Sequence, residues 1–298
     1  MNTIPYFYDQ LWRDHQIDYY EFNNYKLIKD LSKFNDKIKI IILIFEKDNE
    51  RFLFGFDDGI LFPYLINYNI YNFNSNNYRK NINCILINII NEIKDYYSKE
   101  IKIFNYPYYQ YNLGFNLFNF LDIKNNSYFD LINIINDDLL DGLKSNVKNI
   151  INKYNSKKIF NDDKINNYFG EINDDIYNLF INKHFELAGK KTKSNKCWNI
   201  LKQFILDKKA FLVNYKTDFV YFFISTEFSY YGINACTKKS DICTILIYEA
   251  YKFLKSKNCN FIYMYHYVQN TEDEKLLNLS FFKKSISNKI INNFYAII

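Results

Sequence analysis

The sequence predicts an α/β protein built from two similar units, because one order of elements occurs twice along the chain. Hydrophobic residues make up 48% of the 298 residues and charged residues 24%, a balance typical of a folded globular chain. Runs of β-branched and aromatic residues alternate with segments whose apolar residues recur every three or four positions. The order strand, strand, strand, helix, strand is predicted over 37–104 and again over 210–265.

The first unit begins with a strand over 37–46 (KIKIIILIFE), which is short and rich in β-branched residues. A polar turn at 47–50 leads to a returning strand at 51–56, and a turn at 57–59 leads to a third strand at 60–66. Apolar residues spaced by three and four predict a helix over 82–93. A strand over 101–104 completes the unit.

Helices are predicted between the two units. The segment 137–154 places its apolar residues on one face, and Asp137 and Asp138 stand at its start, where carboxylates suit the helix dipole. The segment 174–187 repeats this pattern, and the basic run 189–196 (GKKTKSNK, with Gly189 first) precedes a further helix over 197–206.

The second unit repeats the order of the first. Strands are predicted over 210–215, 219–227 and 230–236, a helix over 241–257, and a last strand over 259–265. We interpret the repetition as a structural duplication. The predicted boundaries are an N-terminal unit over 1–125 and a C-terminal unit over 126–298, with the bridging helices at 137–187.

Composition excludes several classes of function. A net charge of +5, from 38 basic and 33 acidic residues, is too small to indicate nucleic-acid binding by itself, and DNA is not a predicted partner. Five cysteines without a CxxC pair indicate reduced thiols, and three scattered histidines predict no metal site. The first ten residues lack the layout of a signal peptide, and the apolar run 38–45 is too short to span a membrane. These features predict a soluble cytoplasmic protein.

Three stretches together resemble the Fem-type branch of the acetyltransferase-like superfamily, which comprises peptidoglycan-bridge aminoacyltransferases and related acyltransferases. They are 138–158, 184–212 and 230–288. The last contains the run Leu279-Ser280-Phe281-Phe282-Lys283-Lys284, which is similar to the Phe-Lys element that closes the family's second unit. The order and spacing of the stretches carry the resemblance.

The resemblance implies two tandem acetyltransferase-like units, each with a mixed, mainly antiparallel sheet flanked by helices. It also implies a bacterial-type enzyme that transfers an acyl or aminoacyl group to an amine on a sugar or cell-envelope precursor. The co-substrate would be an aminoacyl-tRNA or an acyl-CoA, with tRNA then a partner and with no permanently bound cofactor. The oligomeric state stays open.

Six residues are candidates for holding the donor. A phosphate clamp needs cations and hydroxyls, and the basic loop 190–196 supplies them. The turn before the helix at Asp241 adds two further lysines, although Ser240 or Asp241 acting as a simple helix cap is the alternative explanation of that turn. The candidates are Lys191, Lys193, Ser194, Lys238, Lys239 and Lys283.

The turn before the second unit's helix also bears on the kind of donor. No glycine occurs between Gly232 and Asp241, so this turn lacks the residue that wraps a pyrophosphate most closely. This favours an aminoacyl-tRNA or another bulky donor over tight binding of CoA.

Two residues are candidates for acid–base catalysis. His266 ends a predicted strand, and Glu249 interrupts an apolar helix, so either could take a proton from an amine. A buried, hydrogen-bonded structural role is the alternative for Glu249.

A second class of function remains open. Residues 263–266 (YMYH) stand where relatives in the family tend to carry an acid and a glycine. This difference favours a catalytically degraded relative that serves as a binding or partner subunit. Convergence of Lys191, Lys193 and His266 on one open cleft would favour the enzyme.

Overall fold

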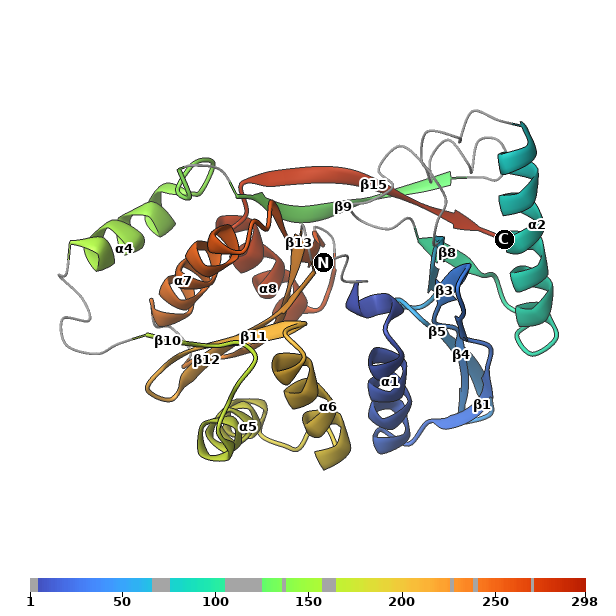
Figure 1. Cartoon of the computed structure of the whole chain (residues 1–298), viewed down its shortest axis with the longest axis horizontal. Helices are drawn as coiled ribbons and strands as arrows, with labels where there is room; N and C mark the ends of the chain where they lie inside the picture. The colour runs from blue at the N-terminus through green and yellow to red at the C-terminus, as the bar shows by residue number, and fades with distance from the viewer. Residues whose placement is uncertain are drawn as a thin grey trace. The chain divides into compact units, whose positions relative to one another are not determined.

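The computed structural model describes residues 5–65, 76–104, 125–135, 138–156, 165–225, 228–237, 241–268 and 271–298. The chain divides into two compact units. Unit 1 comprises Met1–Tyr6 and Phe129–Ile291, and unit 2 comprises Phe7–Tyr128 and Asn292–Ile298. Two long strands, β9 (Asn125–Ile134) and β15 (Lys289–Ile297), each contribute residues to both units, and they lie side by side (Figure 1).

Unit 1 is built on a mixed sheet in the order β10-β11-β12-β13-β14-β9. Its strands besides β9 are β10 (Asn166–Tyr168), β11 (Ala210–Tyr215), β12 (Asp218–Ile224), β13 (Phe228–Ala235) and β14 (Phe261–His266). Neighbouring strands are antiparallel except for β13 and β14, which are parallel. The mainly antiparallel character of the predicted sheet is therefore confirmed.

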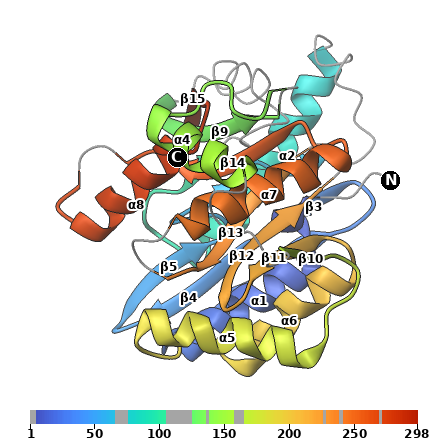
Figure 2. The same cartoon turned by 90° about the vertical axis from the view of Figure 1, so that its left-hand side faces the viewer.

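Helices cover both faces of the unit 1 sheet (Figure 2). They are α4 (Ser145–Asn155), α5 (Asp174–Ala188), α6 (Asn195–Leu206), α7 (Ile242–Ser256) and α8 (Glu274–Ser285). The rings of Phe219 and Tyr221 in β12 pack against Phe180 of α5, whereas Phe222 belongs to the core under α7. Because both faces are covered, all residues of β11 and β12 are buried, which explains why their sequences are continuous apolar runs.

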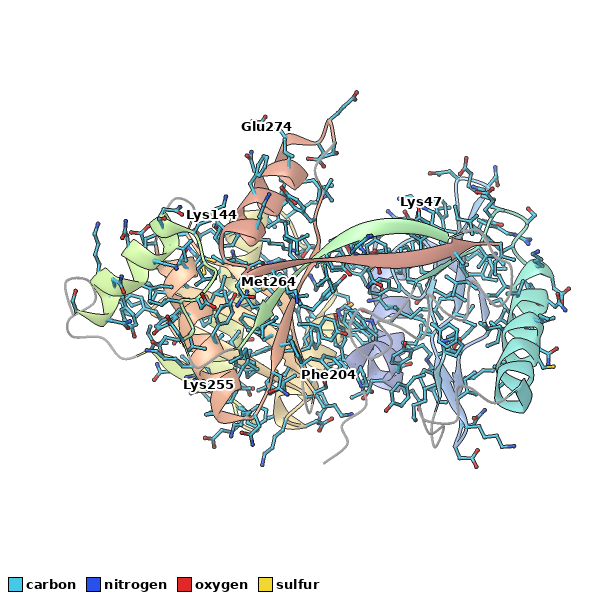
Figure 3. The ribbon with its side chains drawn as sticks, turned by 90° about the horizontal axis from the view of Figure 1, so that it is seen from above. Lys47, Lys144, Phe204, Lys255, Met264 and Glu274 are labelled. Atoms are coloured by element: carbon cyan, nitrogen blue, oxygen red, sulfur yellow. The ribbon has the colours of Figure 1, made fainter. Side chains whose placement is uncertain are left out.

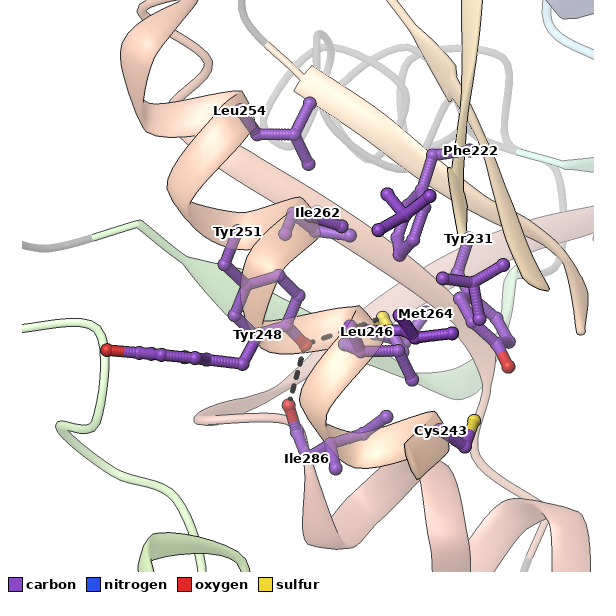
Figure 4. Packing of buried hydrophobic residues seen from close by; sticks show 14 of the residues in the cluster. Phe222, Tyr231, Cys243, Leu246, Tyr248, Tyr251, Leu254, Ile262, Met264 and Ile286 are labelled. Atoms are coloured by element: carbon purple, nitrogen blue, oxygen red, sulfur yellow. Dashed lines mark hydrogen bonds between the residues drawn. The ribbon is translucent and has the colours of Figure 1, made fainter. Parts of the chain in front are cut away.

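The core of unit 1 lies between α7 and the sheet (Figure 4). Leu246 and Leu254 of α7 pack against Phe222 and Ile262 of the sheet, and all four side chains are buried within one hydrophobic cluster. Viewed with all side chains, Phe204 and Met264 lie inside the unit (Figure 3). Burial of these apolar surfaces is the main stabilising contribution to this unit.

A buried amide network joins β9 to the segment after α8. Asn133 is 2% exposed; its Oδ1 accepts the Asn288 N–H at 3.0 Å, and its Nδ2 donates to the Ile286 carbonyl at 2.6 Å and to the Tyr251 hydroxyl. Asn288 pairs in turn with both backbone groups of Ile134, at 2.9 Å and 2.8 Å. The Tyr251 hydroxyl also donates to the Ile286 carbonyl at 2.9 Å (Figure 4). The buried Asn133 amide and the half-buried groups of Asn288 and Ile134 are thereby paired.

Unit 2 carries helices α1 (Gln10–Phe22) and α2 (Asn76–Lys94) and short strands. Two three-stranded sheets have the orders β1-β4-β5 and β2-β3-β7, whereas β15, β8 and β6 follow β9, in that order, in the same nine-stranded sheet. The strands are β1 (Lys26–Asp30), β2 (Lys33–Phe34), β3 (Ile38–Ile40), β4 (Leu43–Lys47), β5 (Glu50–Phe54), β6 (Ile60–Leu61), β7 (Tyr64–Leu65) and β8 (Lys102–Phe104).

Both units share one arrangement, in which a helix connects two parallel strands. In unit 1, α7 connects β13 to β14, and in unit 2, α2 lies between β6 and β8, which are also parallel. The strand order that was predicted twice therefore corresponds to a feature present in each unit.

Several predicted elements differ from the structure. The predicted helix over 137–154 begins only at Ser145, because residues 138–144 form turns in which Gly142 has a φ of 72° and Asp138 accepts the N–H of Leu140; Asp137 lies outside the described residues. The predicted strand over 60–66 is divided into β6 and β7 on either side of Pro63, which lacks a backbone donor. Helix α1 and strands β9 and β15 were not predicted.

Candidate functional site

The candidate site begins where β13 and β14 stop pairing. Their parallel register covers Phe228–Tyr230 against Phe261–Tyr263. On the other side of β13, the register with β12 shifts next to Gly232, which indicates a β-bulge. An added Cβ at Gly232 would lie 3.0 Å from the Tyr221 carbonyl oxygen, so a side chain here would press on the neighbouring strand. The absence of a side chain at Gly232 thus permits the bulge near the end of β13.

A pocket of about 860 Å³ lies in unit 1 at this end of β13. Its walls come from β13 and the following turn, from the start of α7, from α8, and from α5 with the loop that follows it. The lining residues are His184, Leu187, Lys193, Tyr231, Gly232, Ile233, Asn234, Cys236, Thr237, Asp241, Cys243, Thr244, Lys275, Leu279, Phe282 and Lys283.

Lysines dominate the charge of this pocket. Among the residues that the structure describes, Lys193, Lys275 and Lys283 line it, and Asp241 at the start of α7 is the only carboxylate that does so. Lys193 is half-buried, and burial lowers the pKa of its ammonium; its Nζ lies 5.2 Å from the centre of the Trp198 ring. An anionic ligand therefore suits the pocket better than a cationic one.

Lys283 occupies a special position in the pocket wall. Its Nζ lies 5.8 Å from the ring centre of Tyr231 on β13 and 5.1 Å from that of Tyr265 on β14. The two rings belong to the two strands that separate here, so the ammonium lies near the opening between them. Contacts with aromatic faces favour a cation at this place.

His184 forms the wall beside Lys193. Burial, followed by the nearby Lys193 charge, lowers the pKa of His184 to about 4. Its Nε2 lies 2.8 Å from the Thr192 hydroxyl oxygen. The imidazole is therefore neutral at pH 7, and Lys193 is the cation of this wall.

Two thiols stand side by side at the start of α7. A hydrogen bond with Cys243, followed by burial, raises the pKa of the Cys236 thiol strongly, and Asn234 Nδ2 lies 3.1 Å from Cys243 Sγ. Because thiolates and not thiols are nucleophiles, Cys236 is unsuited to carry an acyl group.

The structure brings two of the six predicted donor-binding residues into the pocket, namely Lys193 and Lys283. Lys191 is exposed and does not line it. Ser194 caps α6 instead, since its hydroxyl accepts the Cys197 N–H at 3.0 Å.

The remaining predicted site residues lie elsewhere. Lys238 and Lys239 lie outside the described residues. Glu249 pairs with Lys252 at 2.6 Å and does not line the pocket. His266 does not line it either and pairs with Asp130 of β9 at 2.6 Å. Of Lys191, Lys193 and His266, which were expected to converge on one cleft in an enzyme, only Lys193 therefore lines this pocket.

Sequence reasoning missed several residues of this region. Lys275 belongs to helix α8, which was not predicted. Asp130 lies in β9, a strand that was not predicted. The period-two alternation expected of a half-buried strand is weak there, so only the pairing of β9 with β14 reveals its place.

Within the described ranges, no group of three or more His, Cys, Asp and Glu side chains could hold a metal ion. Over the same residues, none of the helices has the length and apolar character needed to cross a bilayer.

Solved structures share this fold. FemX has a TM-score of 0.61 at 11% identity, covering 95% of this chain and 91% of that one. L-PGS from Bacillus licheniformis has a TM-score of 0.57 at 10% identity, covering 90% and 83%. The C-terminal domain of a protein named as a lysylphosphatidylglycerol synthetase from Agrobacterium fabrum has a TM-score of 0.58 at 6% identity, covering 88% and 84%. No family model matches the sequence, and no curated protein does.

The chain therefore has a tandem, mixed α/β fold of the acetyltransferase-like class. More particularly, it has the fold of the Fem-type branch, as the resemblance of its sequence implied.

Proposed function

We propose that the chain transfers an acyl or aminoacyl group from an activated donor to an amine, with the acyl end of the donor bound in the pocket at the end of β13. The observation that carries this proposal is the position of Lys283, which lies at the opening between two parallel strands and also lines a pocket of about 860 Å³. A pocket of that size suits a small organic group with part of its carrier.

Acyl transfer needs a group that stabilises the negative charge on the oxygen of the donor carbonyl. The amine nitrogen attacks the ester or thioester carbonyl, the new C–N bond forms, and negative charge develops on the carbonyl oxygen. The Lys283 ammonium can donate a hydrogen bond to this oxygen. Collapse of the intermediate breaks the bond to the carrier, whose oxygen or sulfur leaves and takes up the proton lost by the amine. The aromatic contacts that hold Lys283 keep its charge in place before the reaction.

The pocket favours an aminoacyl-tRNA over CoA as the donor. Lys193 and Lys275 can pair with phosphates of the donor. The Asp241 carboxylate, however, lies at the start of α7, where the pyrophosphate of CoA would need the helix amides. Repulsion between the Asp241 carboxylate and the pyrophosphate therefore disfavours CoA.

The structural neighbours support the same class of reaction and suggest its acceptor. One of them is named as a lysylphosphatidylglycerol synthetase, a name that denotes aminoacyl transfer to a lipid whose headgroup offers hydroxyls, so it supports the aminoacyl donor and an envelope acceptor but not the amine. We propose an amine-bearing sugar or cell-envelope precursor as the acceptor for this chain.

Binding of a stable donor analogue tests the proposal. The probes are alanyl-tRNA with a 3′-amide linkage and acetyl-CoA, each measured against the wild type, Lys193→Ala and the matched control Lys191→Ala. Lys191 lies two residues away in the same loop and outside the pocket. Loss of one charged hydrogen bond costs about 1.5–3 kcal/mol, so Lys193→Ala should weaken the analogue roughly 10- to 150-fold. The control should stay within about threefold.

Three results would count against the proposal. Equal weakening by both substitutions would show that only the general charge of the loop matters. Binding of acetyl-CoA in preference to the tRNA analogue would overturn the choice of donor. Failure of the wild type to bind either probe would instead support a binding or partner subunit.

A further inference from the structure

Asp241 brings an acidic side chain to the lysine-rich pocket. The N–H of Ile245 donates to the Asp241 carbonyl at 3.1 Å, so the hydrogen bonds of α7 begin at this residue. Two positions later, Cys243 lies beside Tyr231 of β13 (Figure 4). The start of α7 therefore faces the end of β13, and Asp241 is an exposed residue of the pocket wall.

Helix α7 does not use this carboxylate as a cap. A capping side chain usually belongs to a residue with an extended backbone, which turns its oxygen back toward the free amides of the helix. Asp9 and Asp273, which precede α1 and α8, have such a backbone and accept amides of their helices. Asp241 has a φ of −70° and a ψ of −9°, which are helical, and among the described residues its side chain accepts no capping bond. The helix cap that the sequence allowed at this turn is therefore not Asp241.

The lysines of the pocket do not neutralise Asp241. In the parts of the chain that the structure describes, its carboxylate forms neither a hydrogen bond nor an ion pair. Lys275 of α8, which lines the same pocket, has no ion pair within those parts either. The pocket thus contains a negative and a positive charge, on two different helices, that are not paired with each other.

Two unpaired opposite charges in one pocket suit a ligand that carries both. The reactive end of an aminoacyl-tRNA does so, with an α-ammonium on the acyl group and phosphates on the RNA. A simple acyl group, such as acetyl, has no cation to offer a carboxylate. An ammonium and a carboxylate form a charge-assisted hydrogen bond, which is roughly twice as strong as a neutral one.

The acceptor amine is the other group that a carboxylate could bind, but the chemistry of the transfer argues against it. An amine attacks through its lone pair, so it must be neutral, whereas a neighbouring carboxylate favours the protonated form. Binding of the acceptor amine by Asp241 would therefore slow the reaction. The α-amine of the donor takes no part in bond formation and can stay protonated throughout.

We propose that Asp241 binds the α-ammonium of an aminoacyl donor and thereby makes the chain select aminoacyl over simple acyl groups. The inference rests on the proposed acyl transfer. Lys283 binds the carbonyl oxygen, Asp241 binds the ammonium on the adjacent carbon, and Lys275 binds a phosphate of the carrier. Because the carboxylate keeps the α-amine protonated, this amine has no lone pair and cannot serve as a second acceptor.

Two stable donor analogues that differ in one group test the inference. They are the 3′-amide alanyl-tRNA and the 3′-amide propionyl-tRNA, in which hydrogen replaces the α-ammonium. The wild type should bind the alanyl analogue roughly tenfold more tightly, a preference between those of an exposed ion pair and of a buried charged hydrogen bond. Equal affinity for the two analogues would overturn the proposal, and this comparison needs no variant.

Asp241→Asn tests whether the preference comes from this side chain. The variant keeps the size of the side chain and loses its charge. Its preference for the alanyl analogue should fall below about threefold, with unchanged affinity for the propionyl analogue. Glu272→Gln is the matched control, because Glu272 is also exposed but does not line the pocket; it should keep the full preference. A preference that persists in Asp241→Asn would show that another group binds the ammonium and would refute the proposal.

The same measurements separate this inference from the proposed function. Lys193→Ala should weaken both analogues by the same factor, since Lys193 is assigned to the carrier, whereas Asp241→Asn should weaken only the alanyl analogue. Failure of the wild type to bind either analogue refutes the proposed function itself. Binding of both analogues with equal affinity leaves the donor pocket in place and refutes only the role of Asp241.

Discussion

Replacement of Asn133 by alanine should destabilise unit 1 more than any conservative change at its surface. The side chain is 2% exposed and connects β9 to two other segments through three hydrogen bonds, to Asn288, Ile286 and Tyr251. Alanine removes all three. The Tyr251 hydroxyl and the Ile286 carbonyl still pair with each other, but the Asn288 N–H loses its acceptor.

The expected loss of unfolding free energy follows from these three hydrogen bonds. Each of the two bonds donated by Nδ2 contributes about 0.5–1.5 kcal/mol, and a buried donor left without a partner costs about 1–3 kcal/mol. The free energy of unfolding of unit 1 should therefore fall by about 2–6 kcal/mol. This is a large fraction of the roughly 5–15 kcal/mol by which a typical domain is stable.

Tryptophan fluorescence can report on unit 1 alone. The chain has two tryptophans; Trp198 is buried in unit 1 and Trp12 belongs to unit 2. In a Trp12→Phe background, urea unfolding followed at Trp198 yields the stability of unit 1 with and without Asn133→Ala.

The control for this experiment is Asn152→Ala, at an exposed position of α4, which should change the free energy by less than about 0.5 kcal/mol. A loss below about 1 kcal/mol for Asn133→Ala would show that the hydrogen bonds of Asn133 contribute little to the stability of unit 1.

Three further predictions concern single positions in unit 1. Gly142→Ala should lower the urea midpoint, because the residue has a φ of 72° and an added Cβ would lie 2.7 Å from Asn288 Cβ; an unchanged midpoint would contradict this. Ser194→Ala should cost about 0.5–2 kcal/mol through loss of the α6 cap, measured by the same unfolding. Since the folded pKa of His184 is about 4 and its unfolded value about 6.5, the unfolded chain binds the proton more tightly. Its neutral form therefore stabilises the fold fully above pH 6.5, and that stability is lost as the pH falls toward 4; His184→Gln should lose less stability than the wild type between pH 7.5 and 4.5.

Local signals in the sequence were sufficient for much of unit 1. The predicted strand at 210–215 coincides with β11, and the predicted helices at 174–187, 197–206 and 241–257 lie within two residues of α5, α6 and α7 at each end. In the helical segments, apolar residues recur every three or four positions, and residues that favour helix ends stand at their boundaries. Gly189, which ends α5 in the αL conformation, is an example. The resemblance to the Fem-type branch also came from the sequence, through the order of three stretches.

Local signals failed where the surroundings decide the conformation. Segment 125–134 becomes β9 because β14 offers it a partner, and the partner lies more than 120 residues further along the chain. Residues 138–144 have the apolar residues of a helix, but they form turns that pack Gly142 against Asn288. No window of sequence contains such a partner.

The sequence by itself determined the class of fold, the basic loop and the candidates Lys193, Lys283 and His266. Only the tertiary structure decided that Lys193 and Lys283 share one pocket, that Ser194 is a helix cap, and that Asp130 stands behind His266. The physical reason is that these relations depend on contacts between distant segments, across the separation of β13 and β14 and across the pairing of β9 with β14. Periodicity and composition describe only neighbours along the chain, whereas a site is made of neighbours in space.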